Sequence, residues 1–256
     1  MSDLIDDLKG KKILIAGASS GIGEACAKYL AECGSKIILS ARREKELNRV
    51  KDELAGNGHK VYPFDFSNTN DIEKFVKGIV AENGVLDGMV FSVGVASSRP
   101  LKTIRPDYIK DVMNINFFSF LELARCFTMR NIYNPEKSSI VAISSISALF
   151  GNQSKTAYSA SKAAIDASVR CIAKEFHSKN IRANVVNPGW VKTEIYENQI
   201  ANVGDSADFL DILKRQYQGL IEPIDVAKSV AFLLSDASHF MTGLSVPIDG
   251  GRVSSS

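Results

Sequence analysis

The stretch ILIAGASSGIG at residues 13–23 decides the fold that we expect for this chain. Its first four residues are apolar, which predicts a buried strand, and a helical pattern follows over Gly21–Glu32. Three glycines, Gly17, Gly21 and Gly23, allow positive φ values and a close approach of backbone to a ligand. A helix that begins in such a turn offers free N–H groups and a partial positive charge to a phosphate. We therefore expect a phosphate-binding turn, although the spacing is G-x-x-x-G-x-G and a tight structural turn is the alternative.

Outward from this stretch, short apolar runs alternate with helical patterns along the whole chain. The apolar runs lie at 13–16, 37–39, 61–64, 89–91, 140–143, 183–186 and 244–248. The helical patterns lie at 21–32, 44–54, 70–82, 109–129, 157–176 and 223–234. Apolar runs that alternate with helices predict a parallel sheet with right-handed crossovers. We expect an α/β fold: a single doubly wound domain over residues 1–256, whose seven-stranded parallel sheet is flanked by helices.

Composition and charge exclude several other classes of protein. The chain has 256 residues, of which 45% are hydrophobic and 23% are charged, as in ordinary globular proteins. A net charge of +2 argues against a nucleic-acid partner. Four scattered cysteines and three histidines argue against a disulfide framework and a metal site. Without an apolar signal core or a run of about 20 apolar residues, we expect a cytoplasmic protein with no membrane association.

The segment at 190–219 is the least regular part of the chain. It follows the sixth predicted strand and mixes polar residues with Gly204 and Asp205. Ligands of doubly wound sheets bind outside the carboxyl ends of the strands, where a segment of this kind can cover a substrate. We expect a substrate-covering segment, with an ordinary surface excursion as the alternative.

Tyr158 and Lys162 stand four residues apart in a helical pattern, so they share one face of the helix. A phenol has an ordinary pKa of about 10 and is a poor acid or base near neutral pH. An ammonium beside it favours the phenolate, so we expect Lys162 to lower the pKa of Tyr158. Tyr133 and Lys137 have the same spacing, but Pro135 between them breaks the helix that this alignment requires.

Three serines, Ser144, Ser145 and Ser147, follow the predicted strand at 140–143. A hydroxyl at the carboxyl edge of the sheet can hydrogen-bond a substrate carbonyl oxygen and stabilise the charge that develops there. A nucleophilic serine is the competing chemistry, but no histidine of the sequence stands in a triad-like arrangement with these serines. The residues therefore favour a serine that binds the substrate.

Several motifs together resemble those of the short-chain dehydrogenase/reductase family in its classical form, over essentially the whole chain. They are the Gly17/Gly21/Gly23 turn, Asp65, Ser145, Tyr158-x-x-x-Lys162, Asn187-Pro188-Gly189 with Thr193, and Ile248-Asp249-Gly250-Gly251. The resemblance implies a Rossmann fold and an NAD(P)-dependent oxidoreductase that interconverts a carbonyl and a secondary alcohol. Two alternatives are a non-catalytic nucleotide-sensing protein on this scaffold and a sugar-nucleotide epimerase or dehydratase. The retained motifs argue against the first, and the chain length argues against the second.

By this resemblance the catalytic residues are Asn116, Ser145, Tyr158 and Lys162. The family's spacing to the tyrosine selects Ser145 among the three serines, and Asn116 matches the family's asparagine better than Asn114 does. In the family the tyrosine exchanges a proton with the substrate oxygen, and the serine holds that oxygen. The lysine also binds the nicotinamide ribose, and the asparagine holds a water that completes a proton relay.

The residues after the second predicted strand favour NADP(H) over NAD(H). An NAD-preferring member places an acid near Ala41, but this position is small and neutral here, and two arginines follow. A 2′-phosphate would find room and a planar guanidinium, for which Arg42 is the better candidate and Ser40 an assistant. The alternative is that the arginines only begin a charged helix, which suits Arg43 better. Ser20 stands where many NADP-preferring relatives have a basic residue, so NAD(H) remains the second candidate.

Other cofactor contacts implied by the resemblance come from several loops. Asp65 is expected to bind the adenine amino group, with Phe66 beside it. Gly94 allows close backbone approach, although the family's Asn-Ala-Gly is replaced here by Ser92-Val93-Gly94. The remaining expected contacts are Gly17, Ser19, Ser20, Gly21, Ile22, Gly23, Arg43, Tyr158, Lys162, Pro188, Gly189, Val191 and Thr193.

The substrate is the least determined feature. The resemblance is broadest to the 3-oxoacyl-thioester reductases, so we expect a small carbonyl or alcohol substrate of this kind. Sugars, secondary alcohols and cyclic ketones are the alternatives. No cationic run indicates a phosphate or carboxylate substrate, although Lys155 and Lys192 are placed where they can reach one.

The resemblance also implies a homo-oligomer, a dimer or a homotetramer. In the family the helices at 109–129 and 157–176 pack against one partner, and the last strand packs against another. The apolar residues Phe117, Phe120 and Leu121 suit such an interface, and they suit the core of one chain equally well.

Overall fold

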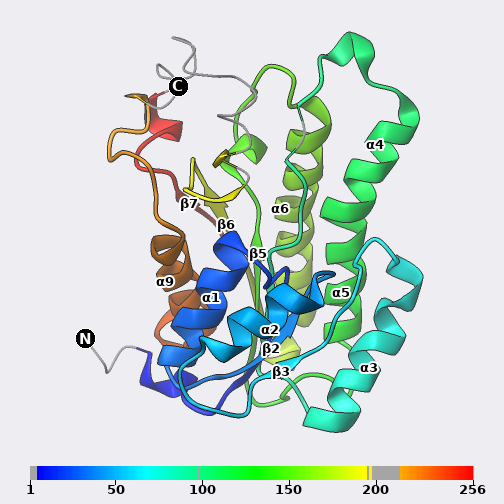
Figure 1. The fold of residues 1–256 in the computed structure, drawn as a ribbon, viewed down its shortest axis with the longest axis vertical. Coiled ribbons are helices and arrows are strands. Elements are labelled where there is room, and N and C mark those ends of the chain that lie inside the picture. The colour runs from blue at the N-terminus through cyan, green and yellow to red at the C-terminus, as the bar shows by residue number, and fades with distance from the viewer. Residues whose placement is uncertain (1–4, 97, 195, 198–213, 256) are drawn as a thin grey trace.

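Seven parallel strands form one sheet in the order β3-β2-β1-β4-β5-β6-β7 (Figure 1). The computed structural model describes residues 5–96, 98–194, 196–197 and 214–255. The strands are β1 Lys12–Ala16, β2 Lys36–Ser40, β3 Lys60–Val61, β4 Gly88–Phe91, β5 Ser138–Ile143, β6 Ile181–Pro188 and β7 Ser245–Ile248. The predicted α/β fold with a seven-stranded parallel sheet is confirmed.

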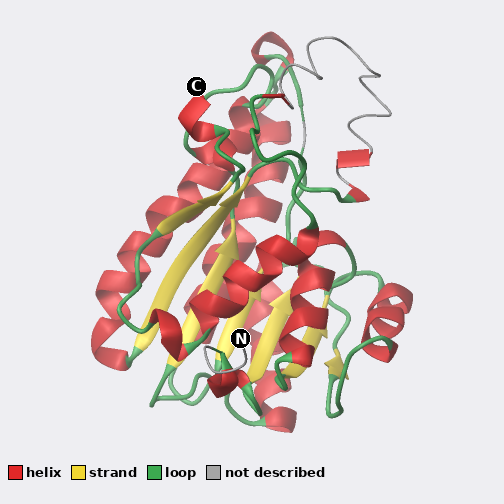
Figure 2. Ribbon diagram, turned by 90° about the vertical axis from the view of Figure 1, so that its left-hand side faces the viewer, coloured by secondary structure: helices red, strands yellow, loops and turns green. Residues whose placement is uncertain are grey.

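Helices cover both faces of this sheet (Figure 2). Their bounds are α1 Gly21–Glu32, α2 Glu44–Asp52, α3 Ile72–Asn83, α4 Pro106–Met113, α5 Ser119–Phe127, α6 Thr156–Phe176 and α9 Pro223–Leu234. One layer contains α1, α2 and α9, and the other contains α3, α5 and α6. The chain thus winds to both sides of the sheet, as the alternating pattern predicts.

Alternation along the strands builds two apolar cores. In β1, Ile13 and Ile15 belong to the core beneath α1 and α9, whereas Leu14 and Ala16 belong to the core beneath α5 and α6. Successive side chains of a strand point to opposite faces, so a continuous apolar run fits a sheet covered on both sides. All four of these residues are almost fully buried.

The third strand is shorter than predicted. The apolar run at 61–64 contributes only Val61 to the strand, which begins at Lys60. Tyr62 and Phe64 still donate their N–H groups to Leu39 and Ala41 of the neighbouring chain segment. Pro63, which has no N–H group, lies between them and interrupts the ladder at this edge of the sheet.

The long helical pattern at 109–129 forms two helices joined by a π-helical turn. This turn, Asn114–Phe118, connects α4 to α5 without a break in the helical path. A π-turn inserts an extra residue into the helix and is often found at functional sites. Here it carries Asn116, whose side chain is fully buried.

The strand order reverses between β1 and β4, where ligands of doubly wound sheets bind. The turns that follow these two strands touch, because a Cβ atom built on Gly17 would lie 2.7 Å from the carbonyl group of Ser92. Gly17 also has φ of 88°, a left-handed conformation that favours glycine. The glycine turn therefore lies at the topological switch point.

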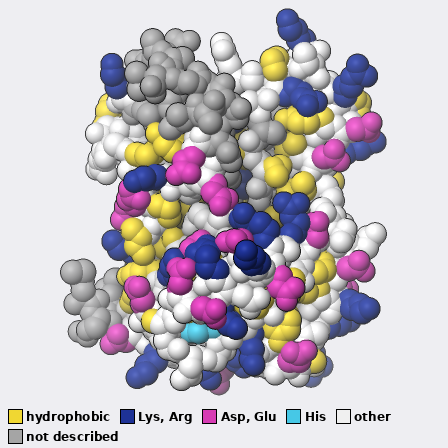
Figure 3. Space-filling view, viewed as in Figure 1, with side chains coloured by type: hydrophobic (Ala, Val, Ile, Leu, Met, Phe, Trp, Pro, Cys, Tyr) yellow, Lys and Arg dark blue, Asp and Glu magenta, His cyan; other side chains and the backbone are white. Residues whose placement is uncertain are grey.

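Charges of both signs are interspersed over the face formed by α1 and α2 (Figure 3). Arg49 pairs with Glu24 and Glu53, and Lys28 pairs with the same two carboxylates. This face therefore has no broad field of one sign. No helix in the described part of the chain is long and apolar enough to cross a membrane.

Replacing Gly23 by alanine should destabilise the fold by about 2 kcal/mol, because the new Cβ would overlap the backbone oxygen of Gly17. Gly78 is the matched control, since it lies inside α3 with open space where its Cβ would be. G78A should stabilise the protein by about 0.5–1 kcal/mol through the higher helix propensity of alanine. Urea unfolding of both variants measures these changes. Equal effects of the two substitutions would contradict the close approach at Gly23.

Candidate active site

The carboxyl ends of the central strands bring the predicted site residues to one edge of the sheet. Ala16, Phe91 and Ala142 are register partners across β1, β4 and β5, and Ile143 pairs with Val186 of β6. The turns that follow these strands are therefore neighbours. They carry the glycine turn, the loop around Gly94, the serines after β5 and the Asn187-Pro188-Gly189 motif.

Helix α6 places Tyr158 and Lys162 one turn apart beside this edge. The Nζ atom of Lys162 lies 5.9 Å from the centre of the Tyr158 ring. Lys162 is 4% exposed, and its ammonium donates a hydrogen bond of 2.9 Å to the backbone oxygen of Ile143 at the end of β5. The sheet thus anchors the lysine while the tyrosine remains partly exposed.

Ser145 lies between β5 and α6 and hydrogen-bonds the Tyr158 side chain. Its Oγ atom also accepts a hydrogen bond of 3.1 Å from the N–H group of Ser147, at the start of a short 3₁₀ turn. Its backbone oxygen accepts one from Asn187 at the end of β6. Two neighbouring strands therefore position Ser145 against Tyr158, and both hydroxyls face one place at the sheet edge.

Asn116 connects the loop after β4 to α6. Its Oδ1 atom accepts a hydrogen bond from the N–H group of Val95, and its Nδ2 atom donates to Val95 O and Ser161 Oγ. A Cβ atom built on Gly94 would lie 3.3 Å from Lys162 Nζ and 3.4 Å from Asn116 Oδ1. The π-turn thus brings Asn116 to the same small volume as Lys162.

The pKa of Tyr158 is raised, which contradicts the expectation that Lys162 lowers it. Burial raises the pKa of the phenol, and the hydrogen bond with Ser145 offsets this only in part. Burial also lowers the pKa of Lys162 to about 8, although the carboxylate of Asp166 acts in the opposite direction. The expectation was wrong because loss of solvent outweighs the attraction of a lysine whose ammonium binds Ile143 O.

The residues that were alternatives to Ser145, Asn116, Tyr158 and Lys162 lie outside the candidate site or have other hydrogen-bond partners. Ser144 is buried and donates to the backbone oxygen of Lys162, and Asn114 donates to the backbone oxygen of Ser67. Tyr133 bridges to Leu86, before the amino end of β4, on the opposite edge of the sheet. Lys137 forms an ion pair with Asp236. Neither belongs to the edge that carries Tyr158.

The glycine turn forms a cradle that side chains would fill. A Cβ atom on Gly17 would meet Ser92, and one on Gly21 would lie 3.3 Å from Thr193 Cγ2. Ser19, Ser20 and Ile22 complete the turn, and α1 begins at Gly21. Bare backbone at a helix N-terminus suits the pyrophosphate of a dinucleotide. The residues present therefore fit a nicotinamide dinucleotide.

Arg43, and not Arg42, contacts the glycine turn. Its guanidinium donates to Ser20 Oγ at 2.8 Å and to Ser19 Oγ at 3.3 Å, and it pairs with Glu194 at 3.5 Å. Arg42 is exposed, and its charge contributes to a lowered pKa of Asp65. Both arginines therefore border the region after β2 where we expect the 2′-phosphate.

Two of the predicted cofactor residues have side chains turned into the protein. Ser40 is fully buried, and its hydroxyl has no hydrogen-bond partner among the described residues. Phe66 packs in the core, edge-on to Phe64. Asp65 is partly exposed, and its Oδ1 atom accepts hydrogen bonds from the N–H and hydroxyl groups of Ser67. Of this group, Asp65 is the residue whose side chain stays accessible.

The end of β6 is held by a residue that the sequence analysis did not identify. Gln216 is buried, accepts from Trp190 N through Oε1 and donates to Trp190 O through Nε2. A Cβ atom on Gly189 would overlap that Oε1 atom. Val191 is buried and bridges to Ile221, and Thr193 Oγ1 bonds Val191 O. Most of the predicted substrate-covering segment at 190–219 lies outside the described residues, but its two described ends are paired here.

A second residue with no role predicted from the sequence is Asp166, which is buried one turn after Lys162. Its Oδ2 atom accepts hydrogen bonds from Asn187 Nδ2 at 2.8 Å and from Ser245 Oγ at 3.1 Å. Asn187 in turn holds the backbone oxygen of Ser145. An acid among the apolar positions of the α6 pattern was the signal in the sequence.

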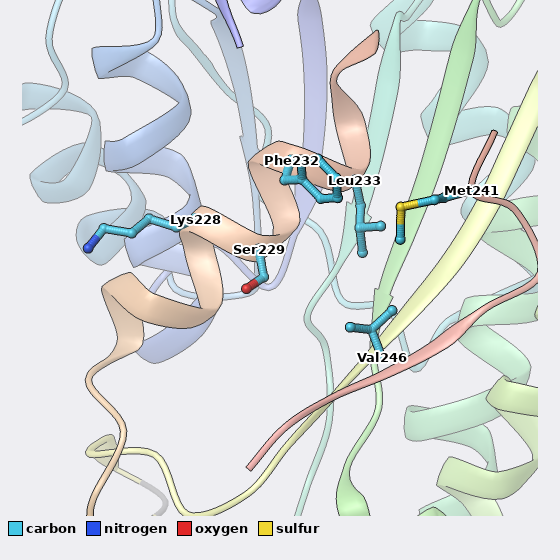
Figure 4. Close-up of a pocket in the computed structure, with 6 residues that line it drawn as sticks. All are labelled: Lys228, Ser229, Phe232, Leu233, Met241 and Val246. Atoms are coloured by element: carbon cyan, nitrogen blue, oxygen red, sulfur yellow. The ribbon is translucent and has the colours of Figure 1, made fainter. Parts of the chain in front are cut away.

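An apolar depression of about 370 Å³ lies between α9 and β7, away from the candidate site (Figure 4). Its lining residues are Lys228, Ser229, Phe232, Leu233, Met241 and Val246. None of them belongs to the predicted site. Nearby, Phe240 is 96% exposed and Leu244 is 40% exposed. Apolar surface of this kind suits a contact with another protein surface.

Comparisons with known proteins agree with this site. A family model described as enoyl-(acyl carrier protein) reductase matches residues 17–252. The 3-oxoacyl-(acyl-carrier-protein) reductase of Vibrio cholerae serotype O1 is 29% identical over 96% of this chain and 98% of its own. The L-xylulose reductase of Caenorhabditis elegans is 31% identical over 96% of both chains. A crystal structure of a dehydrogenase/reductase from Sinorhizobium meliloti 1021 has a TM-score of 0.87 and 28% identity, and covers 98% of this chain and 99% of that one.

The lowered pKa of Lys162 makes a prediction about stability. Between pH 8 and 10 the unfolded chain binds this proton more tightly than the folded protein, so stability rises with pH. Raising the pH from 7.5 to 9.5 should stabilise the wild-type protein relative to K162M by about 2 kcal/mol. Urea unfolding of both proteins at both pH values measures this difference. A difference that stays constant would show that Lys162 keeps its ordinary pKa in the fold.

Proposed function

The chain belongs to the short-chain dehydrogenase/reductase family, and on this premise we propose that it is an NADP(H)-dependent enzyme that interconverts a carbonyl and a secondary alcohol. The family consists of oxidoreductases that use NAD(P) and act on alcohol or carbonyl groups. The observation that carries the proposal is that Ser145 and Lys162 both lie beside Tyr158 at the carboxyl edge of the sheet. This set of groups holds an oxygen and moves a proton.

The proposed cofactor site runs along the carboxyl edge of the sheet. The glycine turn would hold the pyrophosphate, and Asp65 would bind the adenine. Arg42 and Arg43 would bind a 2′-phosphate, since position 41, near which NAD-preferring members place an acid, is a neutral alanine here. The nicotinamide half would lie beside Gly94, Pro188–Gly189, Val191 and Thr193. When bound, the cofactor supplies or accepts a hydride.

In the proposed mechanism, the protein orients the substrate and moves the proton. Ser145 holds the substrate oxygen, and Tyr158 donates its proton to that oxygen in reduction and takes it back in oxidation. Burial keeps Tyr158 protonated at neutral pH, because its pKa is raised. The protonated phenol is the form that donates a proton to the substrate oxygen in carbonyl reduction.

Lys162 and Asn116 are the proposed path for the replacement proton. Lys162 has a pKa of about 8, so it can gain and lose a proton near physiological pH. Its ammonium and the Oδ1 atom of Asn116 both face Gly94. We assign to Asn116 the water that links the lysine to solvent, as the family resemblance implies.

For the substrate, the proposed class is a 3-oxoacyl compound. The Vibrio cholerae relative reduces 3-oxoacyl groups by name, and the Caenorhabditis elegans relative reduces a sugar, L-xylulose. Identity is similar to both, so the sugar remains the alternative. Phe150 follows β5 and Trp190 follows β6, and we propose that these apolar side chains line the substrate site, where they suit an acyl chain better than a polyol.

We further propose a single domain over residues 1–256 that assembles into a homo-oligomer. Phe118 and Leu121 are partly exposed on the helical layer, and Phe240 and Leu244 are exposed beside β7. These two surfaces correspond to the two contacts that the resemblance implies. Phe120, which we expected to suit an interface or the core equally well, is fully buried in the core. The proposed interface on this layer therefore consists of its neighbours and not of Phe120.

The cofactor preference can be tested by binding. Titration with NADPH and NADH, followed by nicotinamide fluorescence, should give tighter binding of NADPH by about tenfold or more. R42Q should remove most of this preference, because it deletes a charged partner of the 2′-phosphate. K45Q removes the same charge from an exposed position on α2 and should leave the preference intact. Tighter binding of NADH by the wild-type protein would overturn the NADP(H) assignment.

The role of Tyr158 can be tested by turnover. Y158F should lower kcat by at least about a hundredfold, because no other hydroxyl donates the proton. The Kd for NADPH should change by no more than a few-fold. Y133F, at a tyrosine on the opposite edge of the sheet, serves as the control and should be fully active. Near-normal turnover of Y158F would refute the mechanism.

A further inference from the structure

Two lysines have their ammonium groups near the ring of Tyr158, and the proposed mechanism uses only one of them. Lys155 has its Nζ atom 5.6 Å from the centre of the Tyr158 ring, and Lys162 has its own at 5.9 Å. The two environments differ. Lys162 donates to Ile143 O and lies near Asp166, which partly balances its charge. Lys155 has no such support.

Among the described residues, the ammonium of Lys155 has no hydrogen-bond acceptor and no carboxylate partner. It is half-buried, and burial lowers its pKa, with no opposite charge to offset this. Partly buried lysines are normally paired or extend their charge into water. The ammonium of Lys155 has no partner of this kind within the described part of the chain and lies over the ring of the proposed proton donor.

The local backbone also gives no reason for a lysine at this position. Lys155 is the N-cap of the 21-residue helix α6, where a side-chain acceptor or an acid is favourable and a cation is not. The preceding residue, Ser154, has φ of 63°, and its carbonyl is held by the N–H group of Arg99. Residues that break local rules near a candidate active site are more often explained by a ligand than by stability.

We propose that Lys155 binds an anionic group of the substrate, a carboxylate that lies a few bonds from the reacting carbonyl. This inference rests on the proposed function, because it takes Tyr158 and Ser145 as the groups that hold the carbonyl oxygen. A carboxylate beside Lys155 would satisfy its charge and its free donors together. The substrate is then a short oxo acid, reduced to the hydroxy acid, which narrows the proposed 3-oxoacyl class to compounds whose carboxylate is free and not esterified.

A carboxylate fits better than a phosphate. Phosphate groups in proteins are bound by several donors, commonly an arginine fork or a series of backbone N–H groups. Lys155 is a single compact charge. The other cation at Tyr158, Lys162, is buried and already donates to Ile143 O. The single positive charge of Lys155 therefore suits the single negative charge of a carboxylate.

The alternative is that Lys155 acts on Tyr158 directly, as a second cation that lowers its pKa. The pKa of Tyr158 is nevertheless raised, and the hydrogen bond with Ser145 is what opposes burial there. The two roles have different consequences. A substrate-binding lysine acts on acids alone, whereas a lysine that changes Tyr158 acts on every substrate.

The test compares oxo acids with their methyl esters. Pyruvate, acetoacetate and levulinate place the carboxylate at three distances from the ketone, and each ester removes the charge alone. With NADPH, the wild-type enzyme should prefer at least one acid to its ester. K155M should raise the KM for that acid by about 10- to 100-fold and change kcat/KM for the ester by less than about threefold. K155R, which keeps the charge, should restore most of the acid's kcat/KM.

Lys192 supplies the matched control. It is a second lysine near the end of β6, but it is exposed and paired with Glu222 at 3.5 Å. K192M should therefore leave the discrimination between acid and ester unchanged. Equal losses of acid and ester turnover in K155M, or the loss of acid preference in K192M instead, would overturn the proposal. So would a wild-type enzyme that reduces the esters as well as every acid.

A binding measurement separates this proposal from the proposed function. Trp190 is the single tryptophan of the chain, so its fluorescence reports acid binding at the end of β6 without turnover. If the wild-type protein binds an acid and K155M does not, the anion site is supported even when no ketone is reduced. In that case only the proposed reaction fails. The absence of any binding by all three acids would refute the anion site, whether or not the esters are reduced.

Discussion

Backbone meets backbone without an intervening side chain where β1 turns into α1, and the rest of the site depends on this approach. A Cβ atom on Gly23 would overlap the oxygen of Gly17, and one on Gly17 would lie 2.7 Å from the carbonyl of Ser92. The contact joins the turns of β1 and β4 where the strand order reverses. It also leaves the N-terminus of α1 at the sheet edge, while apolar residues of the helix pack in the same core as those of α9. A cradle of bare backbone that fits a phosphate and a closed core therefore arise from the same three glycines.

Helix α6 buries charged side chains as well as apolar ones. Ile165 and Val169 pack in the core, yet Lys162 and Asp166 on the same helix are also buried. Burial of these groups is unfavourable unless they are hydrogen-bonded. The lysine donates to Ile143 O, and the Oδ2 atom of the acid accepts from Asn187 and Ser245, whereas its Oδ1 atom has no partner among the described residues. The resulting network ties α6 to the ends of three strands. Within it, Asn187 holds the backbone oxygen of Ser145, and the side chain of Ser145 in turn interacts with Tyr158.

Much of this arrangement could be predicted because it depends on local pattern. The strand–glycine turn–helix of residues 13–32 and the spacing of Tyr158 and Lys162 are properties of short segments, and parallel strands bring their carboxyl ends together. Other features could not be predicted. The π-turn at Asn116, the burial of Phe120 and the two bonds from Gln216 to Trp190 depend on segments far apart in the chain. The pKa of Tyr158 was mispredicted for the same reason, since burial is a property of the whole fold.

By itself, the sequence determined the doubly wound sheet, the family and the residue types that gather at its carboxyl edge. These follow from the periodicity of hydrophobic residues and from the spacing of the motifs, which are both properties of the linear sequence. Only the tertiary structure decided which arginine touches the glycine turn, which groups lose their solvent, and which lysine beside Tyr158 is left without a partner. Such properties depend on distances and on the exclusion of water between elements that are remote in sequence. Solvation and Coulombic energies are set by those distances and not by residue order.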